Sequence, residues 1–364
     1  MPTPLSRVLR ATVVVVVLVA GLQVPAGAQP AGGAPRIILI ASSNLPQHAL
    51  AQVESVSGSL QADLQEQAPV VRVTAGRDLP YLTPADWLRA APLVISFGPC
   101  PDTACELLVR FFVGTPPTRA LLSPDLQTRI QNAQPITLRV GQVTNMETED
   151  IVQAALALFD YATDDCPAAL PLLGRPEFLP SDRMGNVSTL QFFEAVCLHD
   201  LQDYAGAINM LESHRTPVNQ GRQFARLWNA YIADSYAQNF AFDNALRLDN
   251  GNITAARARH AAQNPTDDQM LAELYLLRGH HRLYQYEWNV VLEDYNRALE
   301  IPHAPASAYY YRGLLYYTQN ERQAAYDDLT RFLNTEDSPD SPLAALAAQY
   351  VVELEALLAT PQAK

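Results

Sequence analysis

The sequence predicts an α+β protein, in which a small α/β domain precedes an all-α domain built from repeated helix pairs. Short β-rich runs alternate with helical ones up to about residue 145, and a 34-residue repeat appears after it. The composition changes at the same place, because 16 of the 27 prolines but one of the 16 tyrosines come before residue 146. We therefore expect a signal peptide at residues 1–28, an α/β domain at 29–145 and a helical domain at 146–364.

The first 28 residues have the layout of a secretory signal peptide. Arg7 and Arg10 precede an apolar run from Thr12 to Leu22, and small residues lead up to Ala28. The apolar run is shorter than the 18 or more residues of a spanning helix, which favours cleavage after Ala28 over retention as an anchor. We expect an extracytoplasmic protein, secreted, periplasmic or associated with the cell envelope, with no stable membrane span after cleavage.

The four cysteines are readable once export is expected, because disulfides persist in oxidising compartments. Cys100 and Cys105 bracket a tight loop, and Cys166 and Cys197 lie on consecutive helical units. This favours a Cys100–Cys105 and a Cys166–Cys197 bridge among the three possible pairings. A zinc site is the rival interpretation, but no histidine lies near the first pair, so we expect no metal and no cofactor.

The elements before residue 146 follow the order strand, helix, strand, helix, strand, strand, helix, strand. The predicted strands are 36–41, 70–74, 92–97, 107–113 and 136–140, and the predicted helices are 50–64, one starting at 83, and 124–132. With the strand that ends at Phe97, Gly98 and Pro99, this order resembles the small extracytoplasmic α/β domains of the TolB N-terminal type. No nucleotide-binding, hydrolase or zinc-protease motif occurs in the chain.

The second half repeats itself with a period of 34 residues. Residues 271–300 match the residues 34 positions further on at nine places, including Arg278 with Arg312, Gly279 with Gly313, and Asp294 with Asp328. A 34-residue period is that of the tetratricopeptide repeat, and these two stretches resemble tetratricopeptide repeats. The resemblance implies a superhelical solenoid of helix pairs, in which small residues let the two helices of a pair approach closely.

Small residues 12 positions apart extend this pattern to about five helix pairs. The repeat-packing residues are Ala157 with Ala169, Ala195 with Ala207, Ala233 with Ala245, Gly279 with Val291, and Gly313 with Ala325. We expect the additional length between pairs to form loops at 174–186, 214–222 and 250–268. A helix over 343–358 should close the stack, because an end unit needs a cap.

The resemblance also implies a concave groove lined by the first helix of each pair. The positions that would face it are Phe192, His199, Asp200, Asp234, Gln238, His280, Tyr284, Tyr310, Leu314 and Tyr317. The lysine, asparagine and arginine residues that hold acidic C-termini in chaperone-binding relatives are absent from these positions. The set is aromatic and mildly acidic, which suits an extended peptide with apolar or basic side chains. We expect at least one of the adjacent His280 and His281 on the surface, since neighbouring helical side chains cannot easily share a metal.

The charge narrows the class of partner. The formal net charge is -13, and Lys364 is the only lysine among 25 basic residues. Such a chain is a poor binder of nucleic-acid phosphates, which need a basic surface. The sequence predicts an exported, non-enzymatic scaffold that binds another protein or an extended peptide. The alternative is an enzyme or small-ligand module in the α/β domain, with the repeats as its targeting element.

Overall fold

The computed structural model describes residues 36–42, 45–64, 70–75, 88, 91–100, 105–133, 135–140, 148–174, 186–214, 222–260, 265–335 and 341–359. The predicted signal peptide, the predicted helix start at residue 83 and the loops predicted at 174–186 and 214–222 fall largely or wholly outside these residues. The chain forms two compact units, one ending at Asn239 and one beginning at Phe240. Strands give way to helices at the expected place, but the division between the units lies almost 100 residues later.

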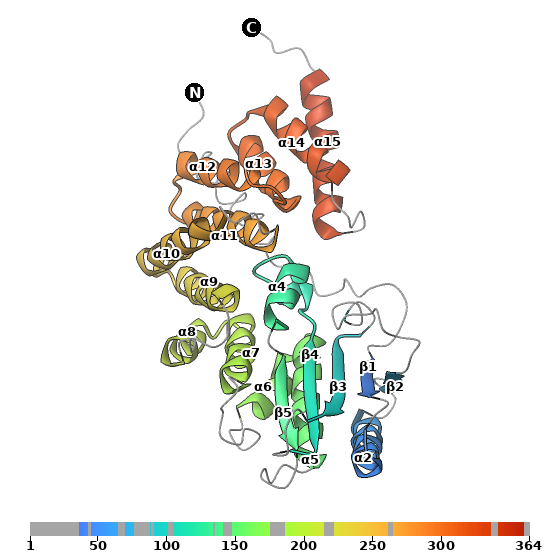
Figure 1. Cartoon of the computed structure of the whole chain (residues 1–364). Helices are drawn as coiled ribbons and strands as arrows, with labels where there is room; N and C mark the ends of the chain where they lie inside the picture. Colours follow the sequence, from blue (N-terminus) through green and yellow to red (C-terminus); the bar gives the residue numbers. More distant parts are fainter. Residues whose placement is uncertain are drawn as a thin grey trace. The chain divides into compact units, whose positions relative to one another are not determined.

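A five-stranded mixed sheet is the centre of the first unit (Figure 1). Its strands are β1 (Ile37–Ser42), β2 (Val70–Ala75), β3 (Leu93–Pro99), β4 (Leu107–Val113) and β5 (Ile136–Val140), in the order β2-β1-β3-β4-β5. Strand β1 is parallel to β2 and β3, whereas β3, β4 and β5 are antiparallel in turn. The predicted hairpin is confirmed, with Ile95 opposite Phe111. All five strands were expected from their apolar, β-rich runs.

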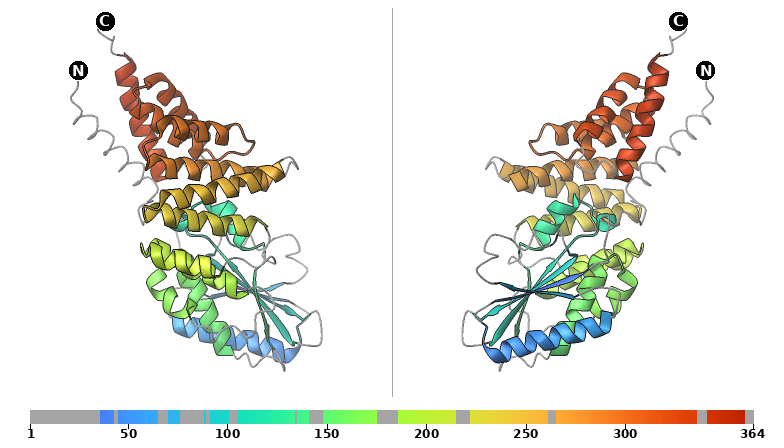
Figure 2. Two further views of the ribbon diagram at one scale, coloured as in Figure 1. Left: turned by 90° about the vertical axis from the view of Figure 1, so that its left-hand side faces the viewer. Right: turned by 90° about the vertical axis from the view of Figure 1, so that its right-hand side faces the viewer.

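Helices α2 (Gln47–Leu64) and α5 (Thr148–Ala162) cover one face of this sheet (Figure 2). Helix α2 contacts β1 and β2, α5 contacts β3 and β4, and the two helices contact each other. Val53, Val56 and Leu60 are buried at helical spacing on α2, as the periodicity predicts. The first helix of the predicted repeats is therefore also a layer of the α/β core.

The other helical elements of the first unit are η1 (Pro117–Arg119), α4 (Pro124–Gln131), α6 (Cys166–Leu173), α7 (Asn186–Asp200), α8 (Tyr204–Ser213) and α9 (Arg222–Gln238). Helices α5 and α6 pack together, as do α7 and α8. Asp165 and Asp203 cap α6 and α8, because each side chain accepts a hydrogen bond from a backbone N–H of the first turn. Both predicted cysteine pairs lie at disulfide distance, and the Cys166–Cys197 bridge ties α6 to α7.

The second unit consists of helices α10 (Phe242–His260), α11 (Pro265–Leu283), α12 (Trp288–Leu299), α13 (Ser307–Thr318), α14 (Arg322–Thr335) and α15 (Pro342–Ala359). Helix α15 is the predicted closing helix and packs against α14. By length and composition it is also apolar enough to cross a membrane, whereas no membrane span was expected after the signal peptide. The loop predicted at 250–268 is wrong, because α10 continues to His260. Burial of Asn252, Ile253 and Ala256 outweighs the weak helix propensity around Gly251.

The ten small residues of the predicted pairs all lie in helices and are buried. Two glycines show why they are small. A Cβ atom on Gly279 would stand 2.5 Å from Cε1 of Tyr295, and one on Gly313 would stand 2.9 Å from Cγ of Leu329. The helices of these two pairs therefore approach too closely for any side chain at the glycine.

The turn that follows the first helix of each predicted pair has the same backbone conformation. A residue with positive φ stands seven positions after each first small residue: Asp164, Gln202, Phe240, Tyr286 and Asn320, with φ between 60° and 74°. Left-handed residues commonly end helices, because they let the next N–H groups reach free carbonyls of the last turn. The spacing of the small residues and the conformation of the turn thus agree in all five predicted helix pairs.

The matched charged residues of the 34-residue repeat form equivalent ion pairs. Arg278 donates to Asp294, with Nε to Oδ2 at 3.1 Å, and Arg312 donates to Asp328, with Nε to Oδ2 at 2.6 Å. Each guanidinium also bonds an asparagine of the preceding helix, which is Asn250 for the first and Asn296 for the second. These bonds explain why arginine and aspartate recur 34 residues apart.

Candidate functional site

Arg119 of η1 enters the face of the first helix pairs that the sequence predicts as a groove. Its Nε lies 2.8 Å from Oδ1 of Asp164 and 3.3 Å from Oδ2 of Asp200. Its Nη1 donates to the carbonyl of Tyr161 at 2.9 Å, and the guanidinium lies over the Tyr161 ring. The side chain is 1% exposed, so one buried cation is balanced by two carboxylates from successive helix pairs.

Helix α4 continues this contact along α9. Gln127 donates to the hydroxyl of Tyr231 at 2.8 Å, and that hydroxyl donates to the carbonyl of Arg119 at 2.6 Å. Gln131 donates to the hydroxyl of Tyr161 at 3.3 Å. Burial raises the pKa of both tyrosines above 10, so their hydroxyls stay protonated as donors. The predicted groove of the first three helix pairs is therefore filled by a segment of the same chain.

Two predicted groove residues of the first unit, Phe192 and Asp200, lie beside this contact. Phe192 is fully buried and packs on Phe224, Trp228 and Tyr231. Asp200 pairs with Arg119, as described above. Gln238 is only half-buried, at the end of α9.

His199 and Asp234, from α7 and α9, contact each other with Nε2 to Oδ2 at 2.6 Å. The imidazole also meets the ring of Tyr204 edge-on. This His–Asp pair resembles half of a catalytic triad, but no described serine or cysteine nucleophile is seen bonded to the imidazole, and Cys197 nearby is disulfide-bonded. The pair is best understood as a polar contact that holds α7 against α9.

The predicted groove residues of the second unit are also covered to a large extent. Tyr310 and Leu314 are buried, and the ring of His280 lies 4.3 Å from that of Tyr311. Tyr317 is half-buried and donates to Glu353 of α15. Tyr284 is half-buried near the surface, in the cluster of rings described next. Of the ten predicted groove positions, Phe192, Asp234, His280, Tyr310 and Leu314 are buried.

The expectation that His280 or His281 lies on the surface is wrong, because both are buried. Nδ1 of His281 lies 2.7 Å from Oδ2 of Asp249 in the core of the second unit. Among the described residues, no three His, Cys, Asp or Glu side chains lie where they could share a metal ion.

A different surface of the second unit carries exposed rings. We call it the aromatic edge, and its residues are Phe240, Phe242, Tyr284, Tyr286 and Trp288. Ring contacts join Phe240 to Phe242, Phe242 to Tyr284, and Tyr286 to Trp288, with centroids 5.7 to 6.2 Å apart. Phe240 is 80% exposed and Tyr286 is 56% exposed. Apart from Tyr284, the sequence did not nominate these residues, although both exposed rings stand seven positions after a small residue.

Both exposed rings occupy the left-handed turn position, where a bulky residue costs about 1–2 kcal/mol. Asparagine and aspartate tolerate this conformation better, and Asn320 and Asp164 occupy the equivalent turns of two other units. Strained residues that persist in a fold are candidates for a functional role. The aromatic edge is therefore the strongest candidate for an interaction surface among the described residues.

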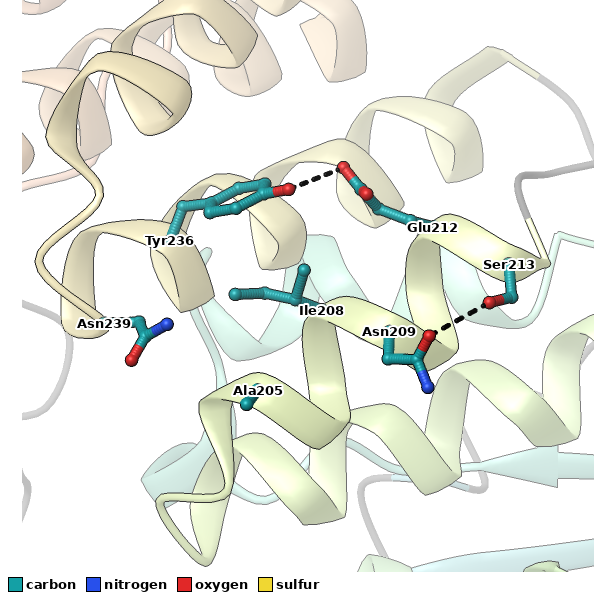
Figure 3. A pocket seen from close by; sticks show the side chains of 7 residues that line it. All are labelled: Ala205, Ile208, Asn209, Glu212, Ser213, Tyr236 and Asn239. Atoms are coloured by element: carbon teal, nitrogen blue, oxygen red, sulfur yellow. Dashed lines mark hydrogen bonds between the residues drawn. The ribbon is translucent and has the colours of Figure 1, made fainter.

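A shallow, open hollow lies between α8 and α9 of the first unit (Figure 3). It is lined by Ala205, Ile208, Asn209, Glu212, Ser213, Tyr236 and Asn239. Tyr236 donates to Glu212 at 2.9 Å, and Ser213 donates to Asn209 at 3.4 Å, so its polar groups largely bond one another. This lining pairs no nucleophile with a base and offers no enclosed binding space.

No protein-family profile matches the sequence, and no curated protein matches it.

Proposed function

We propose that this chain is an exported, non-enzymatic scaffold whose helices form a tetratricopeptide-type solenoid and bind another protein or an extended peptide. The recurrence of the left-handed turn, seven residues after the first small residue of all five units, carries this proposal. Stacked helix pairs of this kind present large surfaces rather than enclosed reaction sites.

The equivalent ion pairs of the second unit support the same proposal. Arg278 with Asp294 and Arg312 with Asp328 repeat one interaction in consecutive helix pairs. Gly279 and Gly313 repeat one close helix contact. A chain in which helix pairs repeat at this level of detail has the construction of an interaction array.

Export is part of the proposal. The N-terminal residues have the layout of a signal peptide, and two cysteine pairs at disulfide distance suit an oxidising compartment. Retention in the periplasm or cell envelope fits both features. The α/β part, with its order of elements like that of TolB N-terminal domains, would then act as part of the scaffold, since its α4 segment is built into the first helix pairs.

The partner would use surface that the chain leaves open. In the first unit the predicted groove holds Arg119 and α4, so a peptide would have to displace a buried ion pair to enter it. Exposed turns between paired helices carry no such obstacle. We therefore place binding at these turns.

Photo-cross-linking of the full chain in the cells that produce it tests this function. A photoreactive amino acid at exposed Asn320 should give discrete protein adducts, whereas the same group at exposed Glu54 of α2 serves as the control position. Adducts from the turn but not from α2 would support a protein partner. Absence of adducts at all exposed turns, together with turnover of a small substrate that one polar substitution abolishes, would refute the scaffold and favour an enzyme.

A further inference from the structure

The five equivalent turns allow a comparison within one chain. The left-handed position holds Asp164, Gln202 and Asn320 in three helix pairs, and these polar residues suit an exposed turn. In the other two helix pairs the left-handed position holds Phe240 and Tyr286, whose rings are exposed to solvent. The backbone there favours small polar residues, so the backbone conformation does not account for aromatic ones.

The rings of these two turns form two groups of contacts, one of three rings and one of two. Phe240 meets Phe242 edge-on, and Phe242 stacks on Tyr284 with an interplanar angle of 21°. Tyr286, two residues along the same turn, meets Trp288 edge-on. Helices α10, α11 and α12, which carry or flank these residues, pack against each other in order. The edge therefore offers several ring faces on neighbouring elements.

The charges beside these rings are acidic. Asp243 follows Phe242, and Glu287 stands between Tyr286 and Trp288, with both acids exposed. Residues 239–243 and 284–289 contain no basic side chain. Ring faces next to carboxylates attract cations, above all the guanidinium of arginine, which stacks on a ring while it bonds a carboxylate.

The same chemistry already occurs inside this chain. The guanidinium of Arg312 lies over the ring of Tyr316 while it bonds Asp328. Arg119 lies over Tyr161 beside Asp164. Tyrosine and a carboxylate thus hold arginine in both units.

We propose that the aromatic edge is a docking surface for a partner segment that presents arginine or lysine among apolar residues. The proposal rests on the proposed function and specifies the class of partner. The basic side chain would lie over Tyr286 or Trp288 with Glu287 as its counter-ion, and the apolar residues would lie against Phe240 and Phe242.

The double variant Phe240→Asn/Tyr286→Asn separates binding from folding. Asparagine suits the left-handed backbone, so the thermal midpoint should stay the same or rise. The probes are two short fluorescent peptides of equal length, one alternating arginine with leucine and one with citrulline in place of arginine. Anisotropy at about 0.15 M ionic strength should show the arginine peptide binding wild type at least about tenfold more tightly than the double variant. Val352→Ala, at an exposed position of α15, is the control and should bind like wild type.

Equal binding of the two peptides, or equal binding by wild type and the double variant, would overturn the proposal. A third result would also overturn the proposal: wild type binds phosphatidylcholine vesicles or chito-oligosaccharides but neither peptide, and the double variant loses that binding. In cells, adducts from Asn320 that persist in the double variant would leave the scaffold function intact and remove this surface from it. No adducts at any exposed turn in the wild-type background, together with turnover of a small substrate, would instead remove the scaffold function itself.

Discussion

Replacing Gly279 by alanine tests whether the small residues of the repeat exist for close helix packing. The new Cβ would stand 2.5 Å from Cε1 and 3.0 Å from Cδ1 of Tyr295. Real Cβ atoms essentially never come this close to another heavy atom, so the ring or the helix must shift. The Tyr295 ring is fully buried and packs against the rings of His280 and Tyr311, which leaves it little room.

The magnitude follows from comparison with Gly251, a second helical glycine of the same unit. Nothing lies within 4 Å of a Cβ built on Gly251. Alanine there should stabilise by about 0.5–1 kcal/mol through helix propensity. The same propensity gain applies at Gly279, but overpacking should cost about 1–3 kcal/mol. Because propensity cancels between the two variants, their difference in unfolding free energy should equal the overpacking cost of about 1–3 kcal/mol.

Urea denaturation followed by far-ultraviolet circular dichroism measures both variants against wild type. Gly251→Ala should raise the urea midpoint above that of wild type. The free energy of unfolding of Gly279→Ala should be about 1–3 kcal/mol lower than that of Gly251→Ala. If both substitutions raise the midpoint equally, α11 and α12 are not in close contact at Gly279. That result would refute the packing explanation of the repeat spacing.

Three further predictions concern the charges and the covalent link. Asp160→Asn should stabilise the protein by about 1 kcal/mol above pH 6 and hardly at all below pH 3.8, because burial, helped by the charge of Asp165, raises the pKa of Asp160 from 3.8 to about 6. The figure is small because solvent partly screens this half-exposed site. Equal stabilisation at both pH values in chemical denaturation would contradict the prediction. The cost of holding this carboxylate ionised appears as pH rises from 3.8 through 6, so wild-type stability should fall over that window relative to the variant. Removing the Cys166–Cys197 bridge, whose cysteines are 31 residues apart, should cost about 3–4 kcal/mol in the same assay, and four free thiols in the unreduced, denatured protein would show that neither bridge forms. Asp328→Ala should cost about 3 kcal/mol by leaving the guanidinium that it holds without its carboxylate, and a double-mutant cycle with Arg312→Ala should show coupling; strictly additive losses would mean that the pair contributes nothing.

Much of the local structure could be predicted because it follows short-range rules. The alternating and apolar runs placed all five strands, and the spacing of 12 between small residues placed ten helices around buried contacts. The cysteine pairs followed from loop length and helix order. The error at 250–268 arose because Asn250 and Gly251 look like breakers in sequence, whereas burial of Ile253 holds the helix together.

The candidate site was less accessible to sequence reasoning. The groove positions were transferred from the repeat pattern, which says which side of a helix faces the inside of the array. It does not say what lies there. Arg119 is 42 residues from Tyr161 and 112 from Tyr231, and no pattern in a single sequence links such positions. The exposed rings of Phe240 and Tyr286 had a positional signal, but only the backbone conformation made it meaningful.

The class of the chain, its acidic net charge, its repeat unit and the residues that must be small where helices meet follow from the sequence alone. These properties depend on side-chain size, periodicity and charge, which act between near neighbours and can be read along the chain. The tertiary structure alone decided that α4 fills the first groove, that the compact units divide after Asn239, and that two aromatic turns stay open to solvent. Those outcomes depend on which distant segments bury each face, and burial is a property of the folded chain as a whole.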